Sequence, residues 1–241
     1  MPSLLELRDV TKSFGSVQAV RNVSLHLAAG EALGIVGPNG AGKTTVLNLI
    51  AGTTRLDRGS IFMDGTDISR LGSHHRPRLG ITRTFQIPRP FGGLTAYENV
   101  LVAYTYGGRR PRRGAAKQAC ATALKTVGLS SKANVLAGRL PLLERKRLEL
   151  ARAVVVRPRT LLLDEVAGGL TEPEVQELVA TVRRLREDGV ALIWIEHVLH
   201  ALEASVDRLL ALAQGEVLIE GKPEEVINST ALRDVYLGRE F

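Results

Sequence analysis

Residues 37–45 read GPNGAGKTT and contain the pattern GxxxxGK[ST], which is typical of a loop that binds a phosphate chain. Glycines let the backbone turn so that its N–H groups converge on an anion, and a following helix N-terminus adds positive potential. A glycine turn with a fortuitous lysine is the weaker alternative. The predicted nucleotide-binding residues are Gly37, Pro38, Asn39, Gly40, Ala41, Gly42, Lys43, Thr44 and Thr45. Among them, Lys43 would reach the β- and γ-phosphates, and the hydroxyl of Thr44 would bind Mg²⁺.

A second candidate group ends the apolar run LLLDE at residues 161–165. A buried parallel strand delivers the side chains at its end to the carboxyl edge of a sheet, where ligands bind. Asp164 is therefore predicted to hold Mg²⁺, through water, and Glu165 to orient and deprotonate an attacking water. A strand that simply ends in two solvated acids is the alternative. The phosphate loop elsewhere in the chain favours the functional interpretation.

The elements around these residues are expected to be strands first and helices later. Residues 4–37 hold short strand-type runs broken at Gly15 and Gly30, and apolar residues at helical spacing follow at 45–52. This strand, loop and helix would position the phosphate loop. A mainly helical lobe is predicted over residues 89–158. Further elements are predicted as helices at 115–127, 144–156 and 172–186 and as buried strands at 160–163 and 190–195. Strands that alternate with helices imply a parallel sheet.

Composition sets broader limits. A chain of 241 residues with 44% hydrophobic content can bury a sizeable core. No apolar run approaches the roughly 20 residues that span a bilayer, and the N-terminus lacks signal-peptide features, so a cytosolic protein is expected. The single cysteine, Cys120, excludes an internal disulfide and is predicted to be buried, as is Trp194. The adjacent His74 and His75 lack metal-ligand spacing.

Charge leaves several partners open. The net charge of +7 permits a nucleic acid or an anionic membrane as a partner without favouring either. A basic loop at residues 107–114, GGRRPRRG, is either simply solvated or close to lipid headgroups. Its arginines are Arg109, Arg110, Arg112 and Arg113.

Taken in order, these motifs and five further segments resemble the ABC transporter ATPases over the whole chain. The resemblance implies an α/β fold with a P-loop NTPase (RecA-like) core, a mainly parallel sheet, an N-terminal antiparallel β subdomain and an inserted helical subdomain. The core with its β subdomain would comprise residues 1–86 and 159–241, and the helical subdomain residues 87–158. The implied cofactors are ATP and Mg²⁺.

The resemblance also assigns roles to single residues. Phe14 in TKSFG would stack on adenine, with Val20 beside it, although a half-buried strand residue is the alternative for Phe14. Gln86 in RTFQ would sense Mg²⁺ and the attacking water. His197 in WIEHV would contact the γ-phosphate, a position where a lone histidine would otherwise be structural.

The family also implies contacts with a second ATPase. Leu170 and Thr171 match the segment that touches the partner domain. Residues 140–144 read LPLLE where the family has LSGGQ or a near variant, whose serine and glycines clasp the γ-phosphate held by the partner. Pro141 lacks a hydroxyl and an N–H, and the leucines after it are bulky. We expect a weak half-site and a heterodimer with a different ATPase. The alternative is a drifted helix cap with intact function and a homodimer.

Three segments are similar to the ATPases of branched-chain amino acid uptake systems. They are RTFQIPRPFGGLTAYENVLVA, the IEH ending and the tail DVYLGREF. The tail also resembles that of the ATPase for lipopolysaccharide export, and carriers of urea and short amides share most of these features. Uptake implies transmembrane permease subunits, a periplasmic or extracellular solute-binding protein, and a peripheral place on the inner face of the cytoplasmic membrane. The alternative function is a soluble ABC ATPase that acts on nucleic acid. For the expected transport function, no nucleic acid partner is expected.

Overall fold

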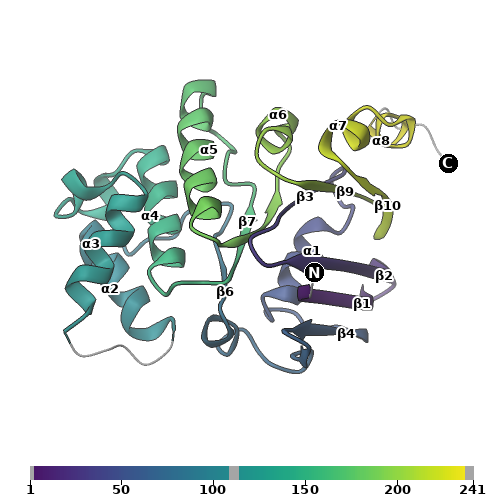
Figure 1. The fold of residues 1–241 in the computed structure, drawn as a ribbon, viewed down its shortest axis with the longest axis horizontal. Coiled ribbons are helices and arrows are strands. Elements are labelled where there is room, and N and C mark those ends of the chain that lie inside the picture. Colours follow the sequence, from purple (N-terminus) through teal and green to yellow (C-terminus); the bar gives the residue numbers. More distant parts are fainter. Residues whose placement is uncertain (1–2, 109–113, 237–241) are drawn as a thin grey trace. The chain divides into compact units, whose positions relative to one another are not determined.

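The computed structural model describes residues 3–108 and 114–236. The chain divides into two compact units, Met1–Ser73 with Ala191–Phe241, and His74–Val190. Each unit combines strands with helices (Figure 1). The boundaries expected for an inserted helical subdomain, at residues 87 and 158, stay predictions.

The first unit begins with an antiparallel sheet of four strands in the order β2-β1-β4-β5. These strands are β1 (Ser3–Phe14), β2 (Val17–Ala28), β4 (Arg58–Met63) and β5 (Thr66–Asp67). Strand β2 buries Val23, Leu25 and Leu27 at alternate positions, the pattern of a sheet with one face in the core. Gly15 and Gly30 have positive φ angles of 59° and 72°, which confirms both as turn positions.

A second set of strands in this unit runs in the order β10-β9-β3-β8. They are β3 (Ala32–Val36), β8 (Ala191–Ile195), β9 (Arg208–Ala213) and β10 (Glu216–Gly221). Strand β3 pairs in parallel with β8 and with β9, and β10 is antiparallel to β9. Every residue of β3 and β8 is buried, as expected for central parallel strands, and Trp194 is confirmed as a core residue. The helices of this unit are α1 (Lys43–Ile50), α6 (Leu199–Glu203), α7 (Pro223–Ile227) and α8 (Thr230–Tyr236).

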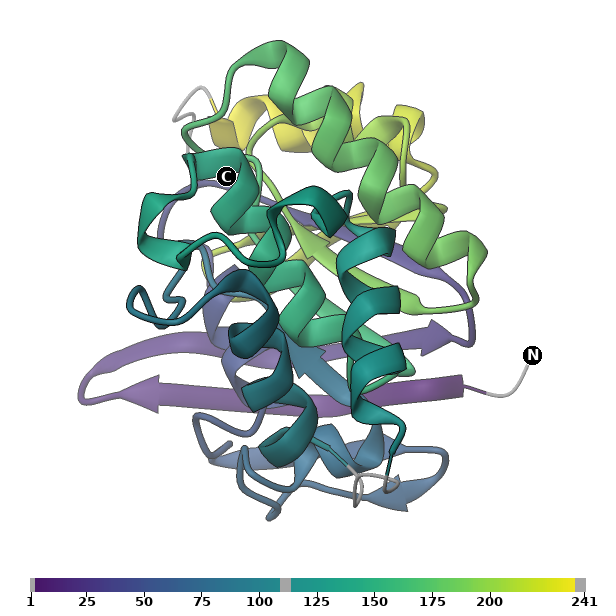
Figure 2. The ribbon, with the colours of Figure 1, turned by 90° about the vertical axis from the view of Figure 1, so that its left-hand side faces the viewer.

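The second unit contains a parallel pair of strands and the helices α2 to α5. Its regular elements are β6 (Ile81–Arg83), β7 (Thr160–Asp164), α2 (Ala96–Tyr106), α3 (Ala116–Thr126), α4 (Leu142–Val154) and α5 (Glu172–Glu187). Helices α2, α3 and α4 pack against one another, and α5 contacts α3 and α4 (Figure 2). Cys120 in α3 is confirmed as buried, and burial raises the pKa of its thiol.

Some sequence interpretations need adjustment or lie outside the described ranges. Helix α4 begins at Leu142, two residues before the predicted start at residue 144. The basic residues Arg109, Arg110, Arg112 and Arg113 fall outside the described residues, as do residues 237–241 of the tail. No helix in the described ranges has both the length and the apolar character that crossing a membrane requires.

Candidate nucleotide site

The phosphate loop joins β3 to α1 in the first unit, as the sequence predicted. Two of its glycines are required by close backbone contacts. Gly37 has φ 146° and Gly42 has φ 98°, and a Cβ atom would overlap the carbonyl oxygen of Leu212 at the first position and that of Ala19 at the second. The loop therefore keeps its shape only with glycine at these two places. Gly42 caps α1, whose first N–H groups lack partners within the helix and suit an anion.

Lys43 lies along this loop. Its side chain is buried, and its Nζ donates hydrogen bonds to the carbonyl oxygens of Gly37 (2.6 Å) and Pro38 (2.9 Å). A buried ammonium group needs such partners. The next residue, Thr44, is exposed at the start of α1. A cation and an exposed hydroxyl therefore stand side by side at the start of the helix.

The residues expected around the base and the γ-phosphate differ in exposure. Phe14 ends β1 with 51% of its surface exposed, and the Nζ of Lys12 lies 5.3 Å from its ring centroid. Its ring is available for stacking. Val20 is fully buried in β2, so the structure gives it a packing role and no exposed surface to offer a base. His197 follows β8 and is exposed.

Tyr236 reaches the phosphate loop from helix α8. Its hydroxyl accepts a hydrogen bond from the Gly37 N–H (3.3 Å), and burial raises its pKa, so the phenol stays protonated at neutral pH. Sequence reasoning missed this contact, although Tyr236 belongs to the DVYLGREF tail that was singled out for its resemblance.

Asp164 is the last residue of β7 in the second unit and is almost fully buried. Its Oδ2 forms an ion pair with Nη2 of Arg83 (2.6 Å), which ends the neighbouring strand β6. The two side chains are only 6% and 11% exposed. Sequence analysis quoted Arg83 within RTFQ but assigned it no role.

Glu165 follows at once and has a left-handed backbone with φ 47°, which is uncommon outside glycine and often found at functional sites. Its Oε2 accepts a hydrogen bond from Nε2 of Gln86. The structure therefore brings together the two residues that the sequence assigned to the attacking water.

The residues predicted to hold Mg²⁺ fit that ion by their chemistry. Thr44, Asp164 and Gln86 offer a hydroxyl, a carboxylate and an amide oxygen, and Mg²⁺ prefers such hard oxygen ligands. A buried carboxylate requires a positive partner, and the guanidinium of Arg83 is such a partner for Asp164.

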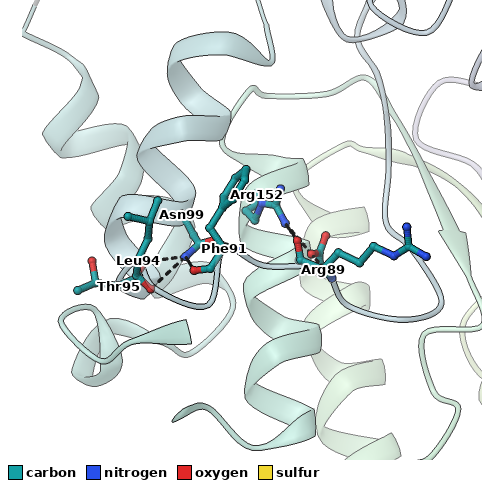
Figure 3. Close-up of polar contacts among 7 residues, drawn as sticks. Arg89, Phe91, Leu94, Thr95, Asn99 and Arg152 are labelled. Carbon is teal, nitrogen blue, oxygen red and sulfur yellow. Dashed lines mark hydrogen bonds and ion pairs between the residues drawn. The ribbon is translucent and has the colours of Figure 1, made fainter. Parts of the chain in front are cut away.

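The loop that follows Gln86 is shaped by Asn99 of α2 (Figure 3). Asn99 is fully buried, and its Oδ1 accepts a hydrogen bond from the Phe91 N–H (2.8 Å). Its Nδ2 lies within hydrogen-bond distance of the carbonyl oxygens of Phe91 (3.1 Å), Leu94 (3.3 Å) and Thr95 (2.9 Å). One side chain therefore contacts four polar backbone groups of this turn.

Helix α4 holds the same loop from its other end (Figure 3). The Glu149 carboxylate is almost fully buried and accepts hydrogen bonds from the Arg89 N–H (3.0 Å) and from Nη1 of Arg152 (2.6 Å). Arg152 also donates to the Arg89 carbonyl (3.1 Å), and its guanidinium lies 5.5 Å from the Phe91 ring centroid. The loop is thereby fixed while Ile87 and Phe91 remain 68% and 49% exposed. Sequence analysis missed this clamp.

The segment LPLLE forms the start of α4. Pro141 is the N-cap and provides no side-chain hydrogen bond to the helix. Leu142 Cδ2 lies 3.3 Å from the position that a Cβ on Gly169 would take, and Leu143 is buried. Glu144 places a carboxylate in the first turn, 3.5 Å from Nζ of Lys132. This helix end thus presents a proline, leucines and an acid in place of a hydroxyl and glycines.

Thr171 caps helix α5. Its N–H and its hydroxyl both donate to Oε2 of Glu174 (2.8 and 2.7 Å), and these bonds lower the pKa of that carboxyl. The structure thus gives Thr171 a capping role. The contact of Leu170 and Thr171 with a partner domain stays a prediction.

Comparison with known proteins agrees with this arrangement. The profile of the ABC transporter family matches residues 20–168. The high-affinity branched-chain amino acid transport ATP-binding protein BraF of Pseudomonas aeruginosa is 37% identical, over 98% of both chains. The lipopolysaccharide export system ATP-binding protein LptB of Acidithiobacillus ferridurans is 35% identical, over all of this chain and 99% of its own.

Solved cassettes share the fold. The ADP conformation of MJ1267, an ATP-binding cassette of an ABC transporter, superimposes with a TM-score of 0.91 at 26% identity, over 99% of this chain and all of its own. A dimeric post-hydrolysis state of the cassette MJ0796, bound to ADP and Pi, gives a TM-score of 0.81 at 27% identity, over 91% and 98% of the chains.

Proposed function

This chain belongs to the ABC transporter family of ATP-hydrolysing cassettes, and on that premise we propose that it drives uptake of branched-chain or other hydrophobic amino acids or amides. The proposed solute class rests on residues 83–103, RTFQIPRPFGGLTAYENVLVA. This segment is similar to the corresponding segment of the branched-chain amino acid uptake ATPases. The near-complete coverage of BraF supports the same class. The similarity to LptB makes lipopolysaccharide export the second candidate.

A transport assay separates these candidates. Membrane vesicles that carry this chain, its permease and its solute-binding protein should accumulate labelled L-leucine or a short amide when ATP is supplied. Accumulation should disappear when ATP is replaced by a non-hydrolysable analogue. If the assembled complex extracts lipopolysaccharide and accumulates neither solute, the uptake proposal is wrong.

For ATP hydrolysis, we propose that the site residues divide the work of binding the phosphates, the adenine and Mg²⁺. The loop N–H groups and Lys43 would hold the phosphates, and the exposed ring of Phe14 would stack on adenine. Mg²⁺, held by Thr44, Asp164 and Gln86, would neutralise charge on the β- and γ-phosphates.

We propose that water is activated by Glu165, with Gln86 holding its carboxylate. His197 would contact the γ-phosphate from the end of β8. The left-handed backbone at Glu165 turns the chain directly after the buried strand, which supports a specialised role for this acid.

The exchange Glu165→Gln tests this assignment. A glutamine at this position can still accept a hydrogen bond from Gln86, so nucleotide binding should persist, whereas hydrolysis should fall by about 10²-fold or more. Phosphate release and fluorescent-nucleotide titration measure the two effects in a mixture with a companion ATPase that has an intact clasp, and gel filtration of this mixture should show trapped closed dimers. Glu187→Gln, an exposed exchange at the end of α5, is the control. Normal hydrolysis by the Glu165 variant would refute the base assignment.

We propose that the permease docks on the loop after Gln86. The exposed side chains of Ile87 and Phe91 offer apolar surface, and the hydrogen bonds from Asn99 and Glu149 keep that surface in one shape. A preformed apolar surface suits a partner helix because little ordering is needed on binding. A permease partner would also place this chain peripherally at the cytoplasmic membrane.

The second ATPase partner is proposed to be a different chain. In place of the serine and the two glycines, the start of α4 has Pro141, Leu142 and Leu143. A companion with an intact clasp would complete the site built on this chain's own phosphate loop, and the site opposite LPLLE would be weak.

A further inference from the structure

A cavity of about 300 Å³ lies inside the second unit, among the C-terminal parts of α3, α4 and α5. This volume is at the small end of the range for ligand sites, which suggests a molecule of few heavy atoms. The cavity is separate from the LPLLE segment and from Thr171, because these lie at the opposite ends of α4 and α5. The 13-residue α4 alone spans about 20 Å.

The walls of the cavity are mainly apolar. Ala123 of α3, Val154 at the end of α4 and Leu185 of α5 contribute aliphatic surface. The two hydroxyls that line it are already used within α3, because Thr126 donates to the Thr122 carbonyl (3.1 Å) and the Thr122 hydroxyl accepts from Gln118 (3.3 Å). These bonds leave the charged side chains of the lining as the main groups that can recognise a charged ligand.

The remaining polar lining consists of two opposite charges, Arg157 and Asp188. Both side chains are exposed, and neither forms an ion pair with the other or with any further residue in the described ranges. An unpaired cation and an unpaired anion at one apolar cavity would complement a ligand that carries both charges itself.

The backbone places these two charges. Arg157 has a left-handed φ of 54°, a conformation in which glycine or asparagine is usual, and its N–H donates to the Val154 carbonyl (2.8 Å) at the end of α4. Asp188 caps the C-terminus of α5. Three helix C-termini contribute partial negative charge around the cavity, which adds to Asp188 in favouring an ammonium group.

We propose that this cavity binds a small α-amino acid with an aliphatic side chain. The side chain of the ligand fills the apolar space, its carboxylate pairs with Arg157, and its ammonium group pairs with Asp188 and the nearby helix carbonyls. The lining of the cavity would select this ligand whatever solute the transporter carries.

Calorimetric titration of the full chain with L-leucine, without ATP or permease, tests the proposal. Saturable binding is expected. The affinity should be about tenfold or more lower for 4-methylpentanoate, which lacks the ammonium group of leucine, and for 3-methylbutylamine, which lacks its carboxylate. Binding is measured apart from hydrolysis and transport, so its failure would leave the proposed uptake function untouched.

Variants locate the site. Arg157→Gln and Asp188→Asn should each weaken binding by about tenfold or more, and Ala119→Leu, which fills the cavity from α3, should abolish it. Arg184→Gln and Glu187→Gln on α5 are matched controls that should bind as the parent does, since neither residue lines the cavity. A thermal melt of each variant checks folding. The proposal is wrong if leucine shows no saturable binding, if both analogues bind equally well, or if the two charge variants bind normally.

Discussion

At the scale of single residues, the ion pair of Arg83 and Asp164 is expected to affect the stability of the fold most directly. Asp164, the acid proposed to bind Mg²⁺, lies at the end of a buried strand, where an unpaired carboxylate would be strongly disfavoured. Arg83 meets that need in the same unit. We infer that the pair holds the Asp164 carboxylate in place before nucleotide arrives.

Arg83→Gln should therefore destabilise the protein. Removing one partner of a buried ion pair costs about 3–5 kcal/mol, which should lower the melting temperature by several degrees. Saturating Mg²⁺ and ATP should recover more stability in this variant than in the parent, because the cation faces the Asp164 carboxylate. Thermal melts with and without Mg²⁺ and ATP measure both effects.

Arg8→Gln is the matched control, since its ion pair with Glu6 is exposed and contributes little. An Arg83 variant that melts with the parent would show that the pair carries no stability. If Mg²⁺ and ATP raise the melting temperature of the Arg83 variant and of the parent equally, the result would argue against Asp164 as a metal ligand.

Sequence reasoning at this scale found the residues that belong to motifs. Gln86 and Glu165 were assigned to one task from separate segments, and the structure joins them by a hydrogen bond. Arg83 and Tyr236 were missed because a single arginine or tyrosine has no spacing that distinguishes it from a surface residue. Val20 is fully buried, and its place beside adenine stays a prediction.

At the scale of elements, helices α2 and α4 support the loop after Gln86. Asn99→Ala should leave the Phe91 N–H and three carbonyl groups without this partner, which we expect to cost about 3 kcal/mol or more. Urea unfolding measures the loss, and limited proteolysis should show faster cleavage within residues 87–95. Gln118→Ala on α3, which removes one exposed hydrogen bond, is the control. Unchanged proteolysis would mean that the loop holds its shape without Asn99.

Element types were predictable where periodicity was strong. The all-buried strands β7 and β8 and the amphipathic helix α5 lie within one or two residues of their predicted bounds. The early start of α4 was hidden because Pro141 and two leucines resemble a connecting loop, whereas proline fits well just before a helix. The hydrogen bonds of Asn99 depend on a turn that no periodicity describes.

At the scale of the whole molecule, the order of motifs was enough to predict the fold that the solved cassettes share. The order cannot reveal the partner, because the contacts that choose it belong to another chain. The residues at the start of α4 favour an unlike partner.

Restoring the clasp tests that argument. The parent chain alone should hydrolyse ATP slowly and gain activity when mixed with a companion ATPase that has an intact clasp. The double exchange Pro141→Ser and Leu142→Gly should raise the rate of the isolated chain by about tenfold or more, since it supplies a hydroxyl and frees the backbone. Lys125→Ala on α3 is a neutral control. A parent chain that is fully active alone would show that LPLLE works as a clasp and that the physical objection to it is mistaken.

Asn99 and Glu149 both bind backbone groups of the loop after Gln86. The shape of this loop therefore does not depend on which side chains it exposes. Ile87 and Phe91 can therefore be exchanged for other residues without redesigning the turn beneath them. With the proposed docking of the permease on this loop, such a cassette would be modular: a few surface substitutions would change which permease it fits, while the site of hydrolysis stays the same.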